Sequence, residues 1–390
     1  MLIQRLLAKH IRDLLSVFPV VAITGPRQSG KTTLAKMLLE QLRVPTVFLD
    51  LESYEDTAKL RFPAPYLRSV AGQTVFLDEV QRMPELFPLI RTLVDAESRP
   101  GRFILLGSAS PALLLKSAES LAGRVVYVEL APLSLEETGV SDFARHWFLG
   151  GYPKAFLMAD DASSRTWLNG FIRTYIERDL PMLGLSAAPM QTRNLLSMCA
   201  SIQGNLLNLS HLANSLGISS NTVSKYLDFL ENSYFIRRLP PFYVNISKRL
   251  VKSPKLYVRD SGVFHALLGI PNIENLYGNA LLGASWEAYV VEQILPALHE
   301  STQAYFYRTA DGSEIDLVLA QGIKPIAAIE IKFSNDPNLG KGSFLAFDDL
   351  KTPHNFVVTP SSDEYLLKEN ITVCNIFTLP KRLRELGLLR

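Results

Sequence analysis

The sequence predicts an α/β protein of several domains, and three observations support this fold class. A short apolar run rich in β-branched residues, 20–24, leads into a glycine-containing loop and then into a helical pattern that starts near Leu34, which is the strand–loop–helix order of a parallel sheet. A second apolar run, 75–77, ends in Asp78 and Glu79. Towards the C-terminus, apolar strands follow one another again. We therefore expect two α/β regions separated by a helical middle.

Length and composition limit the possible classes of protein. With 390 residues the chain is long enough for two or three domains, and its 47% hydrophobic content is sufficient for real cores. The net charge of +2 excludes a global polyanion binder, so any nucleic-acid contact has to come from a local patch. Cys199 and Cys374 show no metal-ligand spacing, so we expect buried thiols in a reducing compartment.

The N-terminal segment predicts a packed helix and not a targeting signal. Residues 1–18 place apolar side chains on one helical face with charges interspersed, and they run into the first strand without a cleavage-type site. No apolar run reaches the roughly 18 residues that a membrane helix needs. The expectation is a cytoplasmic protein without a membrane partner.

The loop after the first strand matches a phosphate-binding pattern at every fixed position. Residues 25–32 read Gly-Pro-Arg-Gln-Ser-Gly-Lys-Thr, which fits G-x-x-x-x-G-K-[ST]. Between a strand and a helix N-terminus, backbone N–H groups converge and the helix dipole adds positive potential. Lys31 would reach the β- and γ-phosphates, and the Thr32 hydroxyl would bind Mg²⁺. We expect ATP with Mg²⁺ here, and the predicted nucleotide-binding residues are Gly25, Pro26, Arg27, Gln28, Ser29, Gly30, Lys31, Thr32 and Thr33.

The following apolar strands supply the polar groups that hydrolysis requires. Asp78 and Glu79 end a strand at the edge where open α/β sheets bind ligands, so Asp78 would hold Mg²⁺ and Glu79 would orient and deprotonate the attacking water. Another strand begins at Phe103 and ends in hydroxyls. Ser108 either faces the γ-phosphate or the water, or caps a following helix at 111–115; for Ser110 the cap is favoured.

Arg124 lies just before a fifth apolar strand, 125–129. A positioned arginine, from the same chain or from a neighbouring subunit of a homo-oligomer, strongly accelerates triphosphate hydrolysis. The alternative is a surface arginine at the start of a strand. Position in the sequence leaves both open.

Five motifs together resemble prokaryotic AAA-superfamily ATPases related to the STAND clade. In order they are GPRQSGKTTL, FLDEVQ, LLGSAS, LAGRV and GGYPKAF. In these proteins a P-loop domain is fused to a C-terminal domain with a nuclease-like core. The resemblance implies that the strand at Phe103 lies between the phosphate-loop strand and the Asp-Glu strand, and that Tyr152 or Pro153 contacts the adenine. It also makes Arg178, in the helical lid, a γ-phosphate candidate; an intrahelical salt bridge is the alternative.

The middle of the chain resembles a winged helix-turn-helix. Residues 210–216 and 220–231 read as two helices around a short turn, and 234–239 as a wing. Acidic residues on the second helix argue against direct DNA reading. However, 237–259 holds seven basic residues and no acid, which favours a polyanion such as DNA over pairing with acids of other domains. The candidate DNA-binding residues are Lys225, Arg237, Arg238, Lys248, Arg249, Lys252 and Lys255.

The C-terminal strands carry the D…E-x-K arrangement of the PD-(D/E)xK nuclease fold. Glu330 and Lys332 share one strand face, and Asp316 lies on the preceding strand. In that fold the carboxylates hold Mg²⁺ and the lysine assists the hydrolytic water. By resemblance to resolvase-like members, Glu287 on the first helix adds a ligand. Active cleavage with a second Mg²⁺, and a nuclease-like shell with an ion-pair network, both stay open.

The predicted domains are a P-loop AAA-type ATPase domain (1–145), a helical lid (146–205), a winged helix with a basic linker (206–260) and a restriction-endonuclease-like α/β domain (261–390). The predicted function is an ATP-hydrolysing ATPase whose nucleotide state controls a DNA-associated winged-helix and nuclease-like module. Two alternatives are a nucleotide-controlled binding switch without nuclease activity, and an active ATP-regulated, Mg²⁺-dependent endonuclease in defence or repair.

Overall fold

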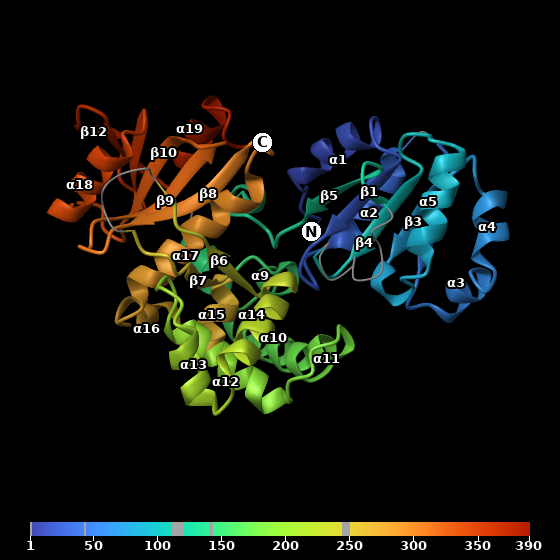
Figure 1. Cartoon of the computed structure of the whole chain (residues 1–390), viewed down its shortest axis with the longest axis horizontal. Helices are drawn as coiled ribbons and strands as arrows, with labels where there is room; N and C mark the ends of the chain where they lie inside the picture. The colour runs from blue at the N-terminus through green and yellow to red at the C-terminus, as the bar shows by residue number, and fades with distance from the viewer. Residues whose placement is uncertain (1, 43, 111–120, 140–142, 244–249) are drawn as a thin grey trace.

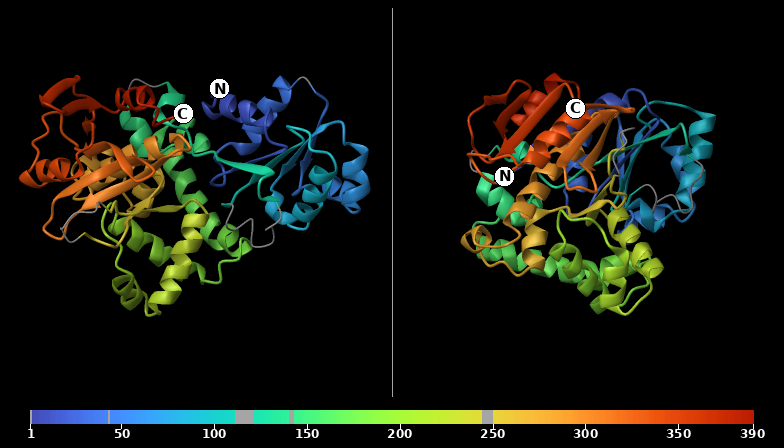
Figure 2. Two further views of the ribbon diagram at one scale, coloured as in Figure 1. Left: turned by 45° about the horizontal axis from the view of Figure 1, so that its top comes forward. Right: turned by 60° about the vertical axis from the view of Figure 1, so that its left-hand side comes forward.

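The computed structural model describes residues 2–42, 44–110, 121–139, 143–243 and 250–390. Two α/β lobes stand side by side, the N-terminal one blue to cyan and the C-terminal one orange to red, with a helical region in green and yellow below and between them (Figure 1). The same three parts are distinct from two further directions (Figure 2). The N-terminal and C-terminal lobes are thus separate layered units that the helical region connects.

The N-terminal lobe is built on a five-stranded parallel sheet in the order β2-β3-β4-β1-β5. Its strands are β1 (Val20–Thr24), β2 (Thr46–Asp50), β3 (Thr74–Asp78), β4 (Phe103–Gly107) and β5 (Val125–Glu129). Strands β1, β3 and β4 are buried along their whole length, as expected of central strands. β4 lies between β1 and β3, as the resemblance implied. All carboxyl ends therefore meet at one edge.

Helices cover both faces of this sheet. They are α1 (Leu7–Leu15), α2 (Lys31–Gln41), α3 (Tyr54–Lys59), α4 (Pro63–Ser69), the short η1 (Val80–Arg82) and α5 (Leu86–Ala96). The short α7 (Leu135–Thr138) follows β5, and its Leu135 packs in the core of the C-terminal lobe. One core joins α1 and α2 to β1 through side chains such as Ile11 and Leu34. A second core joins α4 and α5 to the other face through side chains such as Leu67 and Ile90. The helix predicted at 111–115 lies outside the described residues.

In the helical region the expected lid and the expected winged helix share one core, whereas residues 147–149 and Leu276 belong to the core of the C-terminal lobe. Its elements are α8 (Phe143–Leu149), α9 (Pro153–Phe156), α10 (Asp161–Thr174), the π-helical η4 (Tyr175–Asp179), α11 (Leu180–Met182), α12 (Pro189–Ser201), α13 (Leu209–Leu216), α14 (Ser220–Asn232), β6 (Ile236–Leu239), β7 (Lys255–Val258), α15 (Ser261–Leu267) and α16 (Ile273–Tyr277). Leu196 of the expected lid packs in the same cluster as Leu227 of α14 and Phe264 of α15. The expected basic linker contains β7, which pairs antiparallel with β6.

The C-terminal lobe contains a six-stranded mixed sheet in the order β12-β13-β11-β10-β9-β8. Its elements are α17 (Leu282–Ile294), η5 (Leu295–Ala297), β8 (Thr302–Arg308), β9 (Glu314–Gln321), β10 (Lys324–Ile331), α18 (Lys341–Leu350), β11 (His354–Thr359), β12 (Tyr365–Lys368), β13 (Ile371–Asn375) and α19 (Leu379–Glu385). β8, β9 and β10 are antiparallel, whereas β11 lies parallel to both β10 and β13. Trp147 of α8 packs against Trp286 of α17, so α8 belongs to this lobe's core.

Both cysteines are buried free thiols. In the described part of the chain, no helix combines the length and the apolar character that crossing a membrane requires.

Candidate functional site

The phosphate loop begins where β1 ends, and its first glycine is required by close backbone approach. Gly25 has φ +147°, and a Cβ there would lie 2.3 Å from the carbonyl oxygen of Leu130. The N–H of Leu130 in turn donates to the carbonyl of Thr24 (2.7 Å). Gly30 caps α2 in a left-handed conformation, which a residue with a side chain would adopt only under strain. The loop therefore closes tightly over the N-terminus of α2.

Lys31 is buried and folds back over the loop. Its Nζ donates to the carbonyls of Gly25 (3.0 Å) and Pro26 (2.9 Å). Burial lowers the pKa of Lys31 to about 8, while the nearby charges of Glu79 and Asp78 act in the opposite direction. An ammonium held this way in a loop of converging amides can exchange its carbonyl partners for phosphate oxygens.

Thr32 and Asp78 form the pair that can hold Mg²⁺. The Thr32 hydroxyl donates to Asp78 Oδ2 (2.7 Å), and Asp78 Oδ1 accepts from the N–H of Glu79 (2.9 Å). Burial raises the pKa of Asp78, so a bound cation would stabilise its ionised form. A hydroxyl and a carboxylate are the hard oxygen ligands that suit Mg²⁺ together with phosphate oxygens.

The carboxylate of Glu79 is held by a network of hydrogen bonds that extends to the end of the neighbouring strand, β4. The Ser108 hydroxyl donates to both carboxylate oxygens of Glu79 (3.2 and 3.1 Å). The Gln81 amide also donates to Glu79 and accepts from the N–H of Ser108 (3.4 Å). The backbone of Glu79 is left-handed, with φ +55°. Ser108 therefore lies beside Glu79, and its role towards the γ-phosphate or the water stays a prediction. Gln81 is a polar neighbour of both residues that sequence reasoning missed although it lies in the FLDEVQ motif.

A cavity of about 300 Å³ opens beside this network. Glu79, Gln81 and Ser108 line it from the sheet, Arg27 from the phosphate loop and Asp179 from the lid. Arg27 donates to Asp179 (2.7 Å) and so links the loop to η4. The cavity therefore lies between the Glu79 network, the phosphate loop at Arg27 and the lid.

Two lid residues were predicted to meet the nucleotide. Arg178 is exposed and precedes Asp179, which lines the cavity. Burial raises the pKa of Asp179, and the charges of Arg27 and Arg178 oppose that shift. Pro153 lies next to the loop, because a Cβ at Gly30 would come within 3.9 Å of Pro153 Cγ. Both residues border the site from the lid side.

The structure also gives the contacts of the intrahelical ion pair, of Tyr152 and of Ser110; the helix 111–115, which Ser110 was expected to cap, lies outside the described residues. The intrahelical ion pair in this segment is made by Arg173 and Glu177 (3.0 Å), not by Arg178. Tyr152, the other adenine candidate, packs on Phe171 in the lid core. The Ser110 hydroxyl donates to Asn232 on α14 (2.6 Å).

Arg124 does not reach the phosphate loop within its own chain, so of the alternatives left open the structure disfavours a role in cis. β1 and β5 run in register, with Val20 opposite Val125, so Arg124 lies at the amino end of the sheet, away from the phosphate loop. Its guanidinium pairs with Asp95 on α5. A role in trans stays a prediction.

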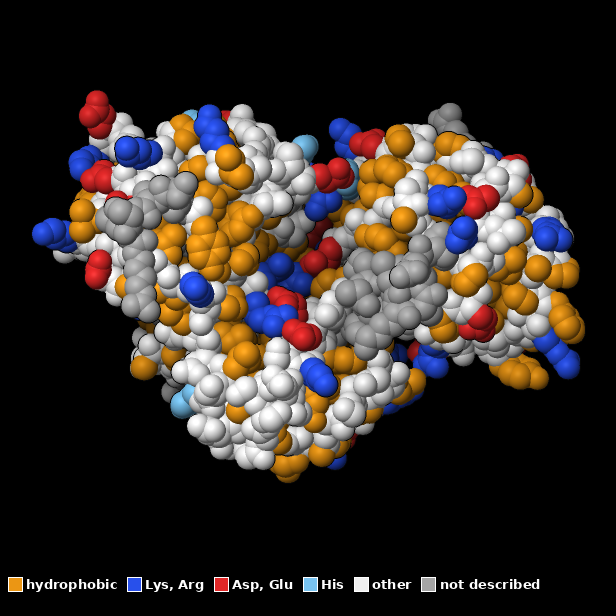
Figure 3. All heavy atoms as spheres, in the orientation of Figure 1, with side chains coloured by type: hydrophobic (Ala, Val, Ile, Leu, Met, Phe, Trp, Pro, Cys, Tyr) orange, Lys and Arg blue, Asp and Glu red, His pale blue; other side chains and the backbone are white. Residues whose placement is uncertain are grey.

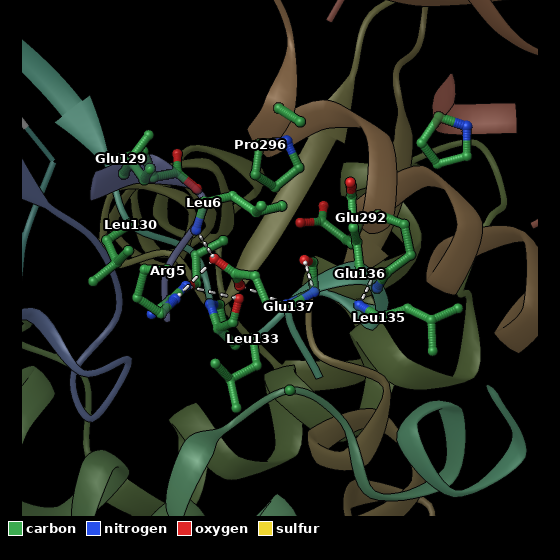
Figure 4. A pocket seen from close by; sticks show the side chains of 18 of the residues that line it. Arg5, Leu6, Glu129, Leu130, Leu133, Leu135, Glu136, Glu137, Glu292 and Pro296 are labelled. Carbon is green, nitrogen blue, oxygen red and sulfur yellow. Dashed lines mark hydrogen bonds and ion pairs between the residues drawn. The ribbon is translucent and has the colours of Figure 1, made fainter. Parts of the chain in front are cut away.

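Arg5 is a buried residue of the site that the sequence did not single out. Its guanidinium donates to the carbonyls of Ser29 (2.8 Å) and Ala131 (2.6 Å) and to Glu137 (3.0 Å). In Figure 4, Arg5 and Glu137 point toward each other in a cavity of about 740 Å³ between the two lobes. Because this contact joins residues far apart in the chain, no local pattern signals it.

The basic segment is largely neutralised by acids, which corrects the predicted uncompensated patch. Arg237 pairs with Glu292, and Arg238 pairs with Glu231 and with Asp228 (2.8 Å). Lys255 is buried, so it is not a phosphate contact. Lys225 and Lys252 are exposed, and Lys248 and Arg249 lie outside the described residues.

The four residues predicted for the nuclease-like site lie close together in the C-terminal lobe. Lys332 pairs with Glu330 (2.7 Å), and Asp316 accepts from the N–H of Ile331 (2.9 Å). Burial, and then the charge of Asp316, raises the pKa of Glu287 and of Glu330 to about 7.

The residues present do not fit the predicted second Mg²⁺. The ammonium of Lys255 lies between Glu287 (2.8 Å), Glu314 (2.7 Å) and Asp316 (3.1 Å). Over the residues that the structure describes, no group of three or more His, Cys, Asp or Glu side chains could hold a metal ion.

The amino-acid sequence is similar to those of two mycobacterial proteins over most of its length. It is 39% identical over 372 residues to the uncharacterized proteins Rv2008c of Mycobacterium tuberculosis and Mb2031c of Mycobacterium bovis, covering 95% of this chain and 83% of each relative. The chain belongs to the family of these two mycobacterial proteins. The similarity to them runs through almost the entire chain and so includes all three parts of the fold.

Family models divide the chain in the same way as the fold. Residues 17–139 match an AAA domain, 140–274 a domain of unknown function (DUF8612), and 282–379 another domain of unknown function (DUF4143). The Walker-type ATPase PABY2304 of Pyrococcus abyssi is 15% identical, with a TM-score of 0.46 over 67% of this chain and 94% of that one. The match of residues 17–139 identifies the N-terminal lobe as an AAA-type P-loop domain, which supports ATP binding and ATPase activity in general.

Proposed function

We propose that the protein hydrolyses ATP at the carboxyl edge of the N-terminal sheet and uses its nucleotide state to reposition the helical region and the C-terminal lobe. One observation carries the hydrolysis: Thr32 and Asp78 meet at 2.7 Å, and Ser108 holds both carboxylate oxygens of Glu79, at adjoining strand ends beside Lys31. A metal-binding pair, a base and a cation are thus assembled in one place.

In this proposal each side chain has one task in the reaction. Lys31 binds the β- and γ-phosphates, and Thr32 and Asp78 hold Mg²⁺, which when bound neutralises phosphate charge. Glu79 accepts a proton from the water that attacks the γ-phosphorus, and ADP leaves as inorganic phosphate forms. Ser108 and Gln81 fix the direction of the Glu79 carboxylate.

The turn that follows α14 is the proposed path from the nucleotide to the rest of the molecule. The Tyr234 hydroxyl donates to Thr24 (2.8 Å), the residue before Gly25, and the backbone N–H of Ser110 donates to the carbonyl of Asn232 (2.8 Å). The Tyr175 hydroxyl of η4 donates to the carbonyl of Ser233 (2.9 Å). Residues 232–234 therefore touch the ends of β1 and β4 and the lid, all of which border the γ-phosphate position.

A nucleotide-controlled switch without nuclease activity is a second candidate function for the C-terminal lobe. Lys255 inside the carboxylate cluster favours it over an active endonuclease. For a DNA partner, the ion pairs of Arg237 and Arg238 remove two of the charges on which that prediction depended.

The proposal is tested by ATP binding and steady-state turnover in the wild type and in Lys31→Ala, with Lys36→Ala as the control. Lys36 is an exposed lysine on the same helix, α2. We expect Lys31→Ala to lose at least roughly 100-fold in turnover, because phosphate positioning and charge neutralisation dominate this reaction. Lys36→Ala should match the wild type. Equal turnover in all three proteins would remove the phosphate loop from the reaction.

A further inference from the structure

We propose that Lys255 is a built-in cation that occupies the centre of the C-terminal carboxylate cluster, so that the native chain binds no divalent metal there and a neutral residue at this position creates a metal site. The inference concerns the C-terminal lobe and does not depend on ATP hydrolysis. The expected ligand of the altered site is a hard divalent cation such as Mn²⁺ or Mg²⁺.

Three carboxylates surround the ammonium group of Lys255. Its Nζ lies 2.7 Å from Glu314, 2.8 Å from Glu287 and 3.1 Å from Asp316. The ammonium donates hydrogen bonds to Glu287 and Asp316, and Glu314 forms an ion pair with it. The three acids come from α17 and β9, whereas Lys255 comes from β7, so the cluster forms only when the helical region packs on the C-terminal lobe.

Lys255 has little freedom to leave this position. The residue is 2% exposed, and its backbone is paired with Leu239 of β6 and with Leu206. Its ammonium also lies 5.7 Å from the ring centre of Phe306, which favours a cation at this point. A metal ion therefore cannot enter unless β7 moves.

A second observation indicates that the cluster has unused capacity for a cation. Glu330 is 3% exposed, and its Oε2 has no hydrogen-bond partner among the described residues. Its other oxygen accepts from Lys332 (2.7 Å) and from Ser343 (2.9 Å). The charge of Asp316 raises the pKa of Glu330, after burial itself, so these acids are close enough to repel one another. A buried carboxylate oxygen without a donor is a costly arrangement that a nearby cation would relieve.

The balance of charge explains why removal of Lys255 should recruit a metal. Four carboxylates (Glu287, Glu314, Asp316, Glu330) face three cationic groups (Lys255, Lys332, Arg308). Without Lys255, three acids lose their shared partner in a buried environment, which destabilises the fold. A divalent cation supplies more charge than was lost and accepts the same oxygen ligands.

The test is Mn²⁺ binding and thermal unfolding of the full-length, nucleotide-free chain, with Mn²⁺ followed by electron paramagnetic resonance. The proteins are the wild type, Lys255→Met, and Lys252→Met as the matched control on the exposed side of the same segment. We expect Lys255→Met to bind one more Mn²⁺ per chain than the other two and to regain with Mn²⁺ the thermal stability that it loses without it. Adding Asp316→Asn to Lys255→Met should abolish the extra binding.

Two results would overturn the proposal. The first is a Mn²⁺ ion in the wild type that Asp316→Asn removes, because the cluster would then hold metal beside Lys255. The second is a Lys255→Met variant that gains no ion. If Lys255→Met does not fold without metal, Lys255→Gln is made as well. We then expect both variants to refold when Mn²⁺ is present. Failure of both to refold with Mn²⁺ would also contradict the inference.

Discussion

His146 and His265 are buried side chains, and their burial favours neutral rings. One ring nitrogen of each donates to a backbone carbonyl (2.9 and 2.8 Å). The other nitrogen of His146 accepts from the Tyr289 hydroxyl (2.9 Å), and that of His265 accepts from the Ser285 hydroxyl (2.7 Å). Burial lowers the pKa of both histidines to about 4. These residues join α8, α15 and α17, so their protonation acts on the packing of the helical region against the C-terminal lobe.

We predict that acid destabilises the protein through these histidines. Since the pKa is about 4 in the fold and 6.5 is the ordinary value, the unfolded chain binds more protons between those pH values, and stability falls as the pH drops from 6.5 to 4. At pH 5 the loss is about 2 kcal/mol for each histidine. Urea unfolding of the wild type and His265→Gln at pH 7 and pH 5 measures it.

The glutamine variant keeps a donor and an acceptor at position 265, so its loss between the two pH values should be smaller than that of the wild type by about 2 kcal/mol. His211→Gln, at an exposed position on α13, should show the wild-type loss. If His265→Gln lost as much stability as the wild type, the ring would not be held neutral in the fold.

Local spacing in the sequence predicts some of the site residues, whereas the contacts of the others depend on long-range packing. The phosphate loop, Asp78 and Glu79 could be recognised because each lies where a strand ends, which the sequence shows directly. Arg5 and Lys255 could not be interpreted in this way. Arg5 meets Glu137 and Lys255 meets Asp316 only after distant elements have packed, and the charges of the basic segment looked unpaired for the same reason.

At the scale of elements, the turn between α14 and β6 is the most constrained connection between the ATPase lobe and the helical region. Tyr234 has φ +64°, a conformation that costs free energy for a residue with a side chain. Its ring is buried and its hydroxyl is bound to Thr24. Because the hydroxyl of Tyr234 is bound to Thr24 and its strained backbone leads into β6, a small displacement of the phosphate loop can be transmitted to β6.

We predict that Tyr234→Phe separates ATP hydrolysis from this transmission. The variant removes only the hydroxyl that reaches Thr24, so turnover should stay within roughly threefold of the wild type, as for loss of one neutral hydrogen bond. Hydrogen–deuterium exchange of α14, β6 and β7 should differ between ADP and a non-hydrolysable ATP analogue in the wild type, and should not differ in Tyr234→Phe. Tyr243→Phe, which changes an exposed tyrosine, is the control. If exchange in Tyr234→Phe differed between the two nucleotides as it does in the wild type, the transmission path would be contradicted.

At the scale of the whole molecule, charged side chains join the two lobes across a hollow. Figure 3 shows blue and red side chains gathered in the space between the lobes. Arg259, just after β7, pairs with Glu129 of β5 and with Glu292 of α17 (3.0 Å), and burial of these charges is compensated by their pairing. β7 thus carries Lys255 into the carboxylate cluster at one end and is tied to the ATPase sheet at the other.

In the proposed function, the ATPase edge is the origin of changes in the distant lobe. The nucleotide would act on Thr24, Lys31 and Glu79, and the consequences would pass through the turn at Tyr234 and through β7 to the C-terminal sheet. Every later step depends on hydrolysis at the first one, so the assignment of Glu79 is the central claim.

The most direct test of that claim is ATP turnover by Glu79→Gln, measured together with ATP affinity in the presence of Mg²⁺. Glutamine keeps the shape of the side chain and can still bond to Ser108, but it cannot accept the proton. We predict that turnover falls by roughly 100-fold or more while ATP still binds with nearly the wild-type affinity. Turnover equal to that of the wild type would contradict the account.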